Sequence, residues 1–263
     1  MAEITPTTIG WKAHPWYTRV AVSGLLVNGL VSLVFAVLSV IDGEASTVWF
    51  FLMYLALSGA SAGLMWRFGK WALAVGATWG FLNLWWGWLL ILALSYPNSF
   101  FDFVLPFLLT VSSLLTGVGA TVALVQQCRG APRTEATRAE RRALGAIVTA
   151  LLGLVILSGI SHIVGRTTVS TEAKAGAVVV EMRNSYLAPE RLEIRVGETT
   201  PILVKNNDFF VHTFEIEELG VDYTVLPFSE LLIDLRPANT GEFTVRSEAM
   251  MTGDMEGTLV VTK

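Results

Sequence analysis

Four side chains near the C-terminal end of the chain have the chemistry of a soft metal site. Met250, Met251 and Met255 lie within six residues of one another, and His212 is the one histidine of residues 176–263. Thioethers prefer Cu(I), and a neutral imidazole also accepts that ion. These residue types predict a Cu(I) site with His212 and the methionines of this loop as its ligands.

Short β-strands must position these side chains. From Ala177 onward apolar and polar residues alternate, as in Leu192, Ile194 and Val196, which is the period of a half-buried strand. The pattern predicts seven strands separated by turn signals, at residues 177–182, 191–196, 201–205, 211–216, 231–235, 242–247 and 258–262. So many short strands predict an all-β Greek-key sandwich or barrel.

Six short motifs follow one another in the same region. They are Tyr186-Leu-Ala-Pro189, Val196-Gly197-Glu198, Lys205-Asn-Asn-Asp208, His212-Thr-Phe, Gly241-Glu-Phe-Thr-Val-Arg-Ser247 and Met255-Glu-Gly-Thr-Leu-Val-Val261. In this order and spacing, residues 176–263 resemble the cupredoxin family, the blue-copper fold. The resemblance implies a cupredoxin-like domain that handles copper or takes part in electron transfer.

The resemblance fails at the ligand positions of a blue-copper centre. Such a centre needs two histidines, a cysteine thiolate and a weak axial methionine. When the last two motifs are aligned with the family pattern, Ser247 occupies the cysteine position and the second histidine position falls near Met251 or Thr252. Only His212 and Met255 stand where ligands are expected, so we expect no blue-copper centre.

Two hypotheses remain for the metal. In the first, His212 with Met250, Met251 and Met255 binds copper, as Cu(I) rather than Cu(II). In the second, no metal is bound, the flexible methionines fill the vacated space, and His212 is a satisfied histidine near the surface. The only cysteine, Cys128, cannot supply the thiolate in either case. It ends a long apolar run that we expect to cross a membrane, as described below, and this places it at the membrane face opposite to residues 176–263.

The rest of the chain has the composition of a membrane protein. The whole chain is 53% hydrophobic and 15% charged, with a mean hydropathy of +0.57. Runs without formal charge at residues 20–41, 47–66, 71–101, 103–127 and 143–165 are each long enough to cross about 30 Å of hydrocarbon. We therefore expect an α-helical membrane bundle of five transmembrane helices. The first run lacks a clear cleavage site, so we expect it to stay as a signal anchor.

Charge asymmetry predicts the orientation of the bundle. Basic residues lie on one side of the runs, namely Lys12, Arg19, Arg67, Lys70 and five arginines of loop 128–142, and acidic residues lie on the other, namely Asp42, Glu44 and Asp102. The positive-inside rule then places the N-terminus in the cytoplasm and the last domain outside it, in an integral protein of the plasma membrane. The main alternative is a split in the overlong run 71–101, because an even number of spans would place that domain inside.

These expectations define six segments of the chain. They are a cytoplasmic tail (1–19), four transmembrane helices (20–127), a basic cytoplasmic loop (128–142), a fifth transmembrane helix (143–165), a linker (166–175) and an extracytoplasmic domain (176–263). Within the spans we expect Asn28, Asn83 and the motifs Gly59-x-x-x-Gly63 and Gly76-x-x-x-Gly80 to pack helices together.

The expected function is that of an accessory protein for copper handling or electron transfer at the outer membrane face. Its partners would be the lipid bilayer and a copper or redox protein outside the cytoplasm. The alternatives are a metal-free interaction module and a non-catalytic subunit of an oxidase-like membrane complex. Residues 176–263 carry seven Lys or Arg against fifteen Asp or Glu, which suits solubility or docking to a basic partner. No motif suggests nucleic-acid binding, and no nucleophile, phosphate-loop or paired-carboxylate motif suggests an enzyme.

Overall fold

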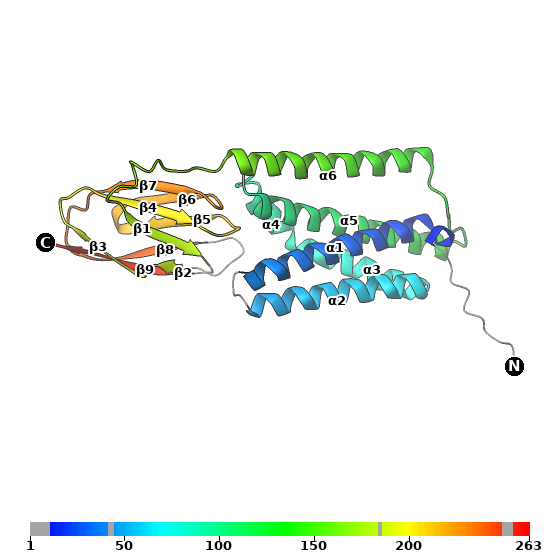
Figure 1. Ribbon diagram of the computed structural model, residues 1–263. Coiled ribbons are helices and arrows are strands. Elements are labelled where there is room, and N and C mark those ends of the chain that lie inside the picture. Colours follow the sequence, from blue (N-terminus) through cyan, green and yellow to red (C-terminus); the bar gives the residue numbers. More distant parts are fainter. Residues whose placement is uncertain (1–10, 42–44, 184–185, 249–254) are drawn as a thin grey trace. The chain divides into compact units, whose positions relative to one another are not determined.

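The computed structural model describes residues 11–41, 45–183, 186–248 and 255–263 (Figure 1). The chain divides into two compact units. The first comprises Met1–Ala36, Trp49–Leu90 and Pro106–Gly153 and is helical, whereas the second comprises Val37–Val48, Ile91–Leu105 and Leu154–Lys263 and contains all the strands.

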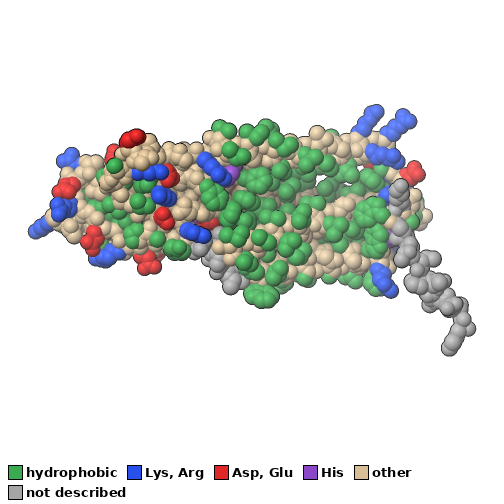
Figure 2. Space-filling model, in the orientation of Figure 1, with side chains coloured by type: hydrophobic (Ala, Val, Ile, Leu, Met, Phe, Trp, Pro, Cys, Tyr) green, Lys and Arg blue, Asp and Glu red, His purple; other side chains and the backbone are tan. Residues whose placement is uncertain are grey.

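Helices occupy the chain up to Val164. In order they are η1 (Trp11–Ala13), α1 (Trp16–Ile41), α2 (Ala45–Arg67), α3 (Lys70–Leu82), η2 (Asn83–Trp86), α4 (Gly87–Ala93), α5 (Phe100–Cys128) and α6 (Arg138–Val164). Among the described residues, four helices are long and apolar enough to cross a membrane: α1, residues 47–67 of α2, α5 and α6. Many large hydrophobic side chains of these helices are exposed, and on the face shown in Figure 2 they gather over the helical part, whereas in water such a surface would be mostly polar.

The run over residues 71–101 is not one continuous helix but is divided, which is the alternative considered for it above. Helix α3 ends at Leu82, the 3-10 turn η2 follows, and α4 ends at Ala93. The side-chain amide of Asn83 donates a hydrogen bond to the Trp79 carbonyl (2.8 Å), and the backbone N–H of Asn83 is shared between the carbonyls of Trp79 and Phe81. A side chain that competes for backbone partners in this way favours local tightening of a helix.

Small and polar residues pack the helices of the first unit as predicted. A Cβ on Gly80 would collide with the backbone of Gly117, so only glycine permits this approach of α3 to α5. The amide of Asn28 donates to the Ser113 hydroxyl (3.0 Å), which joins α1 to α5. A Cβ added to Gly59 or to Gly63 would meet no atom within 4 Å, so this part of the prediction was wrong.

Residues 178–262 form a β-sandwich. Its strands are β1 (Val178–Arg183), β2 (Tyr186–Ala188), β3 (Arg191–Arg195), β4 (Thr200–Asn206), β5 (His212–Ile216), β6 (Val221–Val225), β7 (Glu230–Leu235), β8 (Gly241–Ser247) and β9 (Met255–Thr262). One sheet has the order β2-β1-β4-β7 and the other β3-β9-β8-β5-β6. The pairs β1–β4 and β3–β9 are parallel and the other pairs antiparallel.

All seven predicted strands are present, and the all-β sandwich is confirmed. In β3 only Leu192 and Ile194 are buried, which is the alternation that the sequence shows. The two missed strands have weak patterns, since β2 has three residues and β6 buries only its two ends. The core lies between the sheets and includes Val180, Ile202 and Phe214, all fully buried.

The start of the linker is held against β7 by Glu230. Its carboxylate accepts hydrogen bonds from the Lys174 ammonium (2.8 Å) and from the Val169 N–H (3.0 Å). The backbone N–H of Glu230 donates to the Thr167 carbonyl (2.9 Å). The Lys174 ammonium, and after it the Val169 N–H, hold the pKa of Glu230 below its ordinary value of 4.5.

Replacing Glu230 by Gln should therefore loosen the linker in a pH-dependent way. At pH 7 we expect amide exchange at Val169 to rise about tenfold, because a hydrogen bond to a charged group contributes about 1.5 kcal/mol or more. The lowered pKa of Glu230 means that this stabilisation is complete above 4.5 and is lost as the pH falls below that value. The difference between variant and wild type should therefore shrink below pH 4.5. Hydrogen exchange on the full chain, read by mass spectrometry, measures both effects.

The matched control is Glu218→Gln. Glu218 is exposed and forms no ion pair within the described ranges. Its replacement should leave exchange at Val169 unchanged at every pH. Equal exchange in the two variants would contradict the role of Glu230.

Candidate metal centre

His212 lies inside the β-sandwich. It is the first residue of β5, and the strand buries every second side chain, so His212, Phe214 and Ile216 all face the core and are 0% exposed. The metal-free hypothesis expected a histidine near the surface, and this expectation was wrong. The sequence alternation that predicts the strand also predicts the burial, since His212 shares its face with two apolar residues.

Asp208 fixes the orientation of the His212 ring. Nε2 of His212 lies 3.1 Å from Oδ2 of Asp208, and both side chains are 0% exposed. The other oxygen of Asp208 accepts the Phe209 N–H (2.7 Å), and the Asp208 N–H donates to the Asn206 side chain (2.9 Å). With the Asp208 carboxylate as acceptor, Nε2 of His212 is the donor, and in the neutral tautomer that this contact favours Nδ1 keeps its lone pair.

Nδ1 of His212 is buried and has no hydrogen-bond partner among the described residues. Buried polar atoms are nearly always paired, because an unpaired one loses its hydration without compensation. A lone pair held in place and left without a donor is suited to bind a metal ion. The carboxylate behind the ring matches the arrangement that orients histidine ligands in metalloproteins.

The segment before His212 is anchored by a second buried carboxylate, that of Asp102 in α5. Its Oδ2 accepts the Val211 N–H (2.9 Å) and the Ser99 hydroxyl, and the side chain is 0% exposed. The rings of Phe101 and Phe209 meet edge to face, 5.4 Å apart. These residues all belong to the second compact unit. The backbone next to His212 is thus fixed from the start of α5.

Sequence analysis missed this role of Asp102 and used the residue only to assign the sides of the membrane. The sequence feature that could have indicated this role is the position of Asp102, a single acidic residue between the apolar runs 71–101 and 103–127. An ionisable group in such a place is expensive to bury and is commonly functional.

Met255 is buried at the same end of the sheet as His212. In the β8–β9 ladder Met255 lies opposite Ser247, and both are at most 2% exposed. The β5–β8 register pairs Glu215 with Arg246, and the Thr213 N–H reaches the Glu248 carbonyl (3.1 Å). The start of β5, the end of β8 and the start of β9 therefore lie side by side.

A second described thioether, that of Met182, lies near this end of the sandwich. The Ser247 hydroxyl is 3.8 Å from the sulfur of Met182, which is fully buried near the end of β1. The Met182 carbonyl accepts the Asn207 N–H (3.0 Å), which ties β1 to the segment that carries Asp208. Sequence analysis missed Met182, although it ends the first predicted strand. Of the predicted ligands, Met250 and Met251 lie outside the described residues.

A metal ion at this end of the sandwich would be offered an imidazole and thioethers but no thiolate. Ser247 offers a hydroxyl, which is a poor ligand for soft metals, and the only cysteine is the last residue of α5. Within the described part of the chain no three His, Cys, Asp or Glu residues are placed to hold one metal ion. An imidazole nitrogen with thioether sulfurs suits Cu(I) and does not suit a blue-copper centre.

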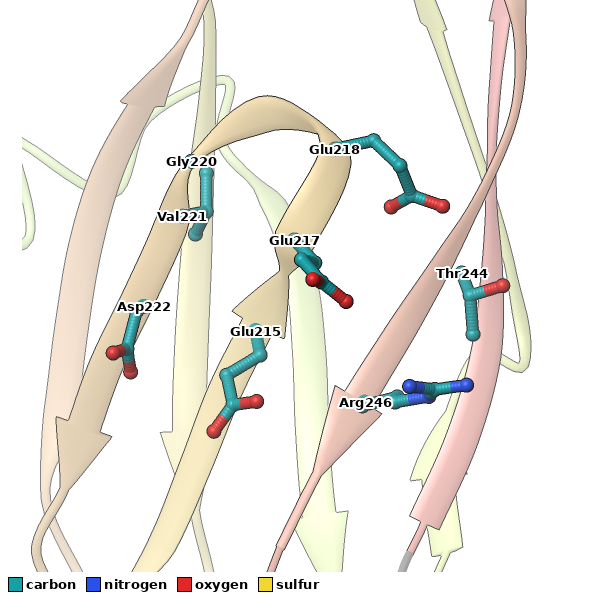
Figure 3. A pocket seen from close by; sticks show the side chains of 8 residues that line it. All are labelled: Glu215, Glu217, Glu218, Gly220, Val221, Asp222, Thr244 and Arg246. Atoms are coloured by element: carbon teal, nitrogen blue, oxygen red, sulfur yellow. The ribbon is translucent and has the colours of Figure 1, made fainter.

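The β-sandwich also has an acidic concave surface (Figure 3). It encloses about 360 Å³ and is lined by residues of β5, η3 (Glu217–Leu219), β6 and β8: Glu215, Glu217, Glu218, Gly220, Val221, Asp222, Thr244 and Arg246. Arg246 also lies 3.5 Å from Glu256. Four acidic residues against one arginine give this surface a negative potential. The carboxylates lie at separate positions, so no group of them among the described residues is placed to hold a metal ion.

Residues 148–261 match the family model of the cupredoxin-like domain. The chain carries a cupredoxin-like domain. The predicted resemblance is therefore confirmed for the C-terminal part of the chain, and the family match begins inside α6. A comparison with curated protein sequences found no match.

Solved structures similar to the chain include several copper proteins. A copper-containing nitrite reductase from Thermus scotoductus is 20% identical over 33% of this chain and 22% of its own length, with a TM-score of 0.27. A chain of a heme-copper terminal oxidase dimer is 18% identical over 48% of this chain and 100% of its own, with a TM-score of 0.31. A purple cupredoxin from Nitrosopumilus maritimus is 14% identical over 32% of this chain and 99% of its own, with a TM-score of 0.24.

The absence of a thiolate gives an optical prediction. With Cu(II), the wild-type protein should show no intense visible band, because sulfur-to-copper charge transfer needs a cysteine ligand. The variant Ser247→Cys should gain such a band, because the new thiolate lies at the end of β8 beside the start of β5. Ser229→Cys places a thiol at another buried serine of the same unit and should stay colourless. An intense blue wild-type protein would contradict the assigned donor set.

Proposed function

We propose that the protein is a membrane-anchored accessory protein that binds Cu(I) in its cupredoxin-like domain, outside the cytoplasm. The observation that carries this proposal is the buried, unpartnered Nδ1 of His212. Met255 supplies a thioether at the same end of the sheet, and Met250 and Met251 belong to the connection between β8 and β9. Copper held there would be available for transfer to, or electron exchange with, a partner protein.

The proposal extends to the way in which the chain crosses the bilayer. The interrupted segment α3–η2–α4 contains 13, 4 and 7 residues. At about 1.5 Å per α-helical and 2.0 Å per 3-10 residue it is about 38 Å long, enough for about 30 Å of hydrocarbon. With the four long apolar helices this gives five crossings, which place the two ends of the chain on opposite sides of the bilayer. The basic residues near the N-terminus and in loop 128–142 then favour a cytoplasmic N-terminus and a cupredoxin-like domain on the outer side of the plasma membrane.

The second candidate is a metal-free interaction module or a non-catalytic subunit of an oxidase-like complex. The acidic concave surface around Glu217 and Asp222 favours it, because such a surface suits a basic partner. In this case the methionines would fill core space only. Metal binding by the purified protein separates the two candidates.

The Cu(I) proposal predicts about one ion per chain and a defined set of sensitive residues. His212→Gln and Met255→Leu should each weaken Cu(I) binding at least about tenfold. A loss of this size is typical even when the replaced residue only orients a metal ligand. Leucine preserves the apolar volume of Met255, so the effect reports the sulfur and not the packing. Competition titration of the full chain with a Cu(I) chelator measures the affinities.

The matched control is Met53→Leu, which removes an exposed thioether of α2 and should leave affinity unchanged. Equal affinities in all four proteins would overturn the Cu(I) proposal and favour the metal-free module.

The orientation is tested with single cysteines in a Cys128→Ser background, since Cys128 is exposed. An impermeant thiol reagent applied to intact cells should label Glu218→Cys, in the β-domain, and should not label Thr134→Cys, in the basic loop. After permeabilisation both should react. Labelling of position 134 alone in intact cells would reverse the topology.

A further inference from the structure

The loop between α5 and α6 is built around Glu140. The Thr137 N–H donates to the Glu140 carboxylate (2.7 Å) and the Glu140 N–H donates to the Thr137 hydroxyl (3.2 Å), which is a capping box at the start of α6. The second carboxylate oxygen accepts the Tyr17 hydroxyl (2.6 Å) and the Arg133 guanidinium (2.7 Å). This single carboxylate therefore joins α1, the loop and α6 within the first unit.

The same loop is bound directly to the start of α1. The Trp16 N–H donates to the Arg133 carbonyl (2.7 Å), and the Arg19 guanidinium donates to the Thr134 carbonyl. The Arg19 guanidinium also lies 5.3 Å from the centroid of the Trp16 ring. These contacts enclose a pocket of about 470 Å³ lined by Trp16, Arg19, Thr134, Glu135, Ala136 and Arg141.

The pocket has cationic groups that the protein leaves unneutralised. Nε of Arg19 is buried without a hydrogen-bond partner, and Arg141 forms no ion pair, as far as the described residues show. Arg133 is the loop arginine that is paired, at 2.7 Å from Glu140. Glu135 is the one acid in the lining. By contrast, the β-sandwich arginines Arg191, Arg195 and Arg246 each lie within 4 Å of a glutamate.

We propose that this pocket binds the headgroup phosphate of an anionic phospholipid. Two guanidinium groups match the oxygens of a phosphate in charge and geometry. Trp16 supplies an aromatic surface at the end of an apolar helix, where tryptophans meet the headgroup region. Arg129, Arg138 and Arg142, in the same loop and at the start of α6, are exposed and add positive charge that attracts anionic lipids. The inference rests on the proposed membrane insertion and is independent of copper.

The test is lipid binding to the full chain in detergent, read by native mass spectrometry with phosphatidylglycerol, phosphatidylcholine or inorganic phosphate. Wild type should bind one phosphatidylglycerol more tightly than phosphatidylcholine. Arg19→Gln with Arg141→Gln should weaken this binding about tenfold or more, whereas the matched pair Arg129→Gln with Arg142→Gln removes the same charge outside the lining and should retain it. Arg141→Gln alone should also weaken phosphatidylglycerol binding. This single variant keeps the Arg19–Thr134 contact, so a loss of binding in it does not come from misfolding of the loop.

Equal losses in the two double variants would show diffuse attraction and overturn the pocket assignment. Inorganic phosphate that displaces phosphatidylglycerol at equal concentration would assign the site to free phosphate and overturn the lipid. Binding of both lipids with equal affinity would also overturn it. The cysteine labelling described above tests membrane insertion separately, so failure of the topology is distinguishable from failure of the pocket.

Discussion

The copper site proposed for the cupredoxin-like domain depends on one hydrogen bond between two fully buried side chains, His212 and Asp208. It orients the ring with Nε2 toward Asp208 and leaves Nδ1 inside the sandwich with no partner among the residues that the structure describes. Without Asp208 the ring could rotate or change tautomer. The rest of the domain supports this arrangement, since Asn206 orients Asp208, and Asp102 holds the backbone at Val211.

The cupredoxin-like domain lacks the cysteine thiolate that a blue-copper centre needs. Ser247 stands at the end of β8 opposite Met255, and Met182 lies beside it, so the donors at this end of the sandwich are an imidazole, thioethers and a hydroxyl. Soft, neutral donors stabilise Cu(I) relative to Cu(II). We therefore favour copper binding or transfer over a fast redox couple. The acidic outer face is a separate property of the same domain.

Local patterns in the sequence predicted the elements, and contacts between distant residues decided the site. Alternation of apolar and polar residues predicted the strands, and the length of the apolar runs predicted the long helices. A split in the run 71–101 was considered only as an alternative and was not located at Asn83, because a single polar side chain marks it in a continuous apolar background. Asp102 and Met182 were missed because their roles need residues that are far apart in sequence, Val211 and Ser247. No periodicity reports such a contact.

The most direct test of the central claim is the state of the His212 ring nitrogens. The chain has three histidines, so a long-range ¹H–¹⁵N spectrum of histidine-labelled protein contains few signals. Those of His212 are identified by comparison with the variant His212→Gln, in which they are absent. The account predicts a neutral ring with its proton on Nε2 in the metal-free protein, and a change in the Nδ1 chemical shift when Cu(I) is added. A proton on Nδ1, or an Nδ1 shift that Cu(I) does not alter, would contradict it.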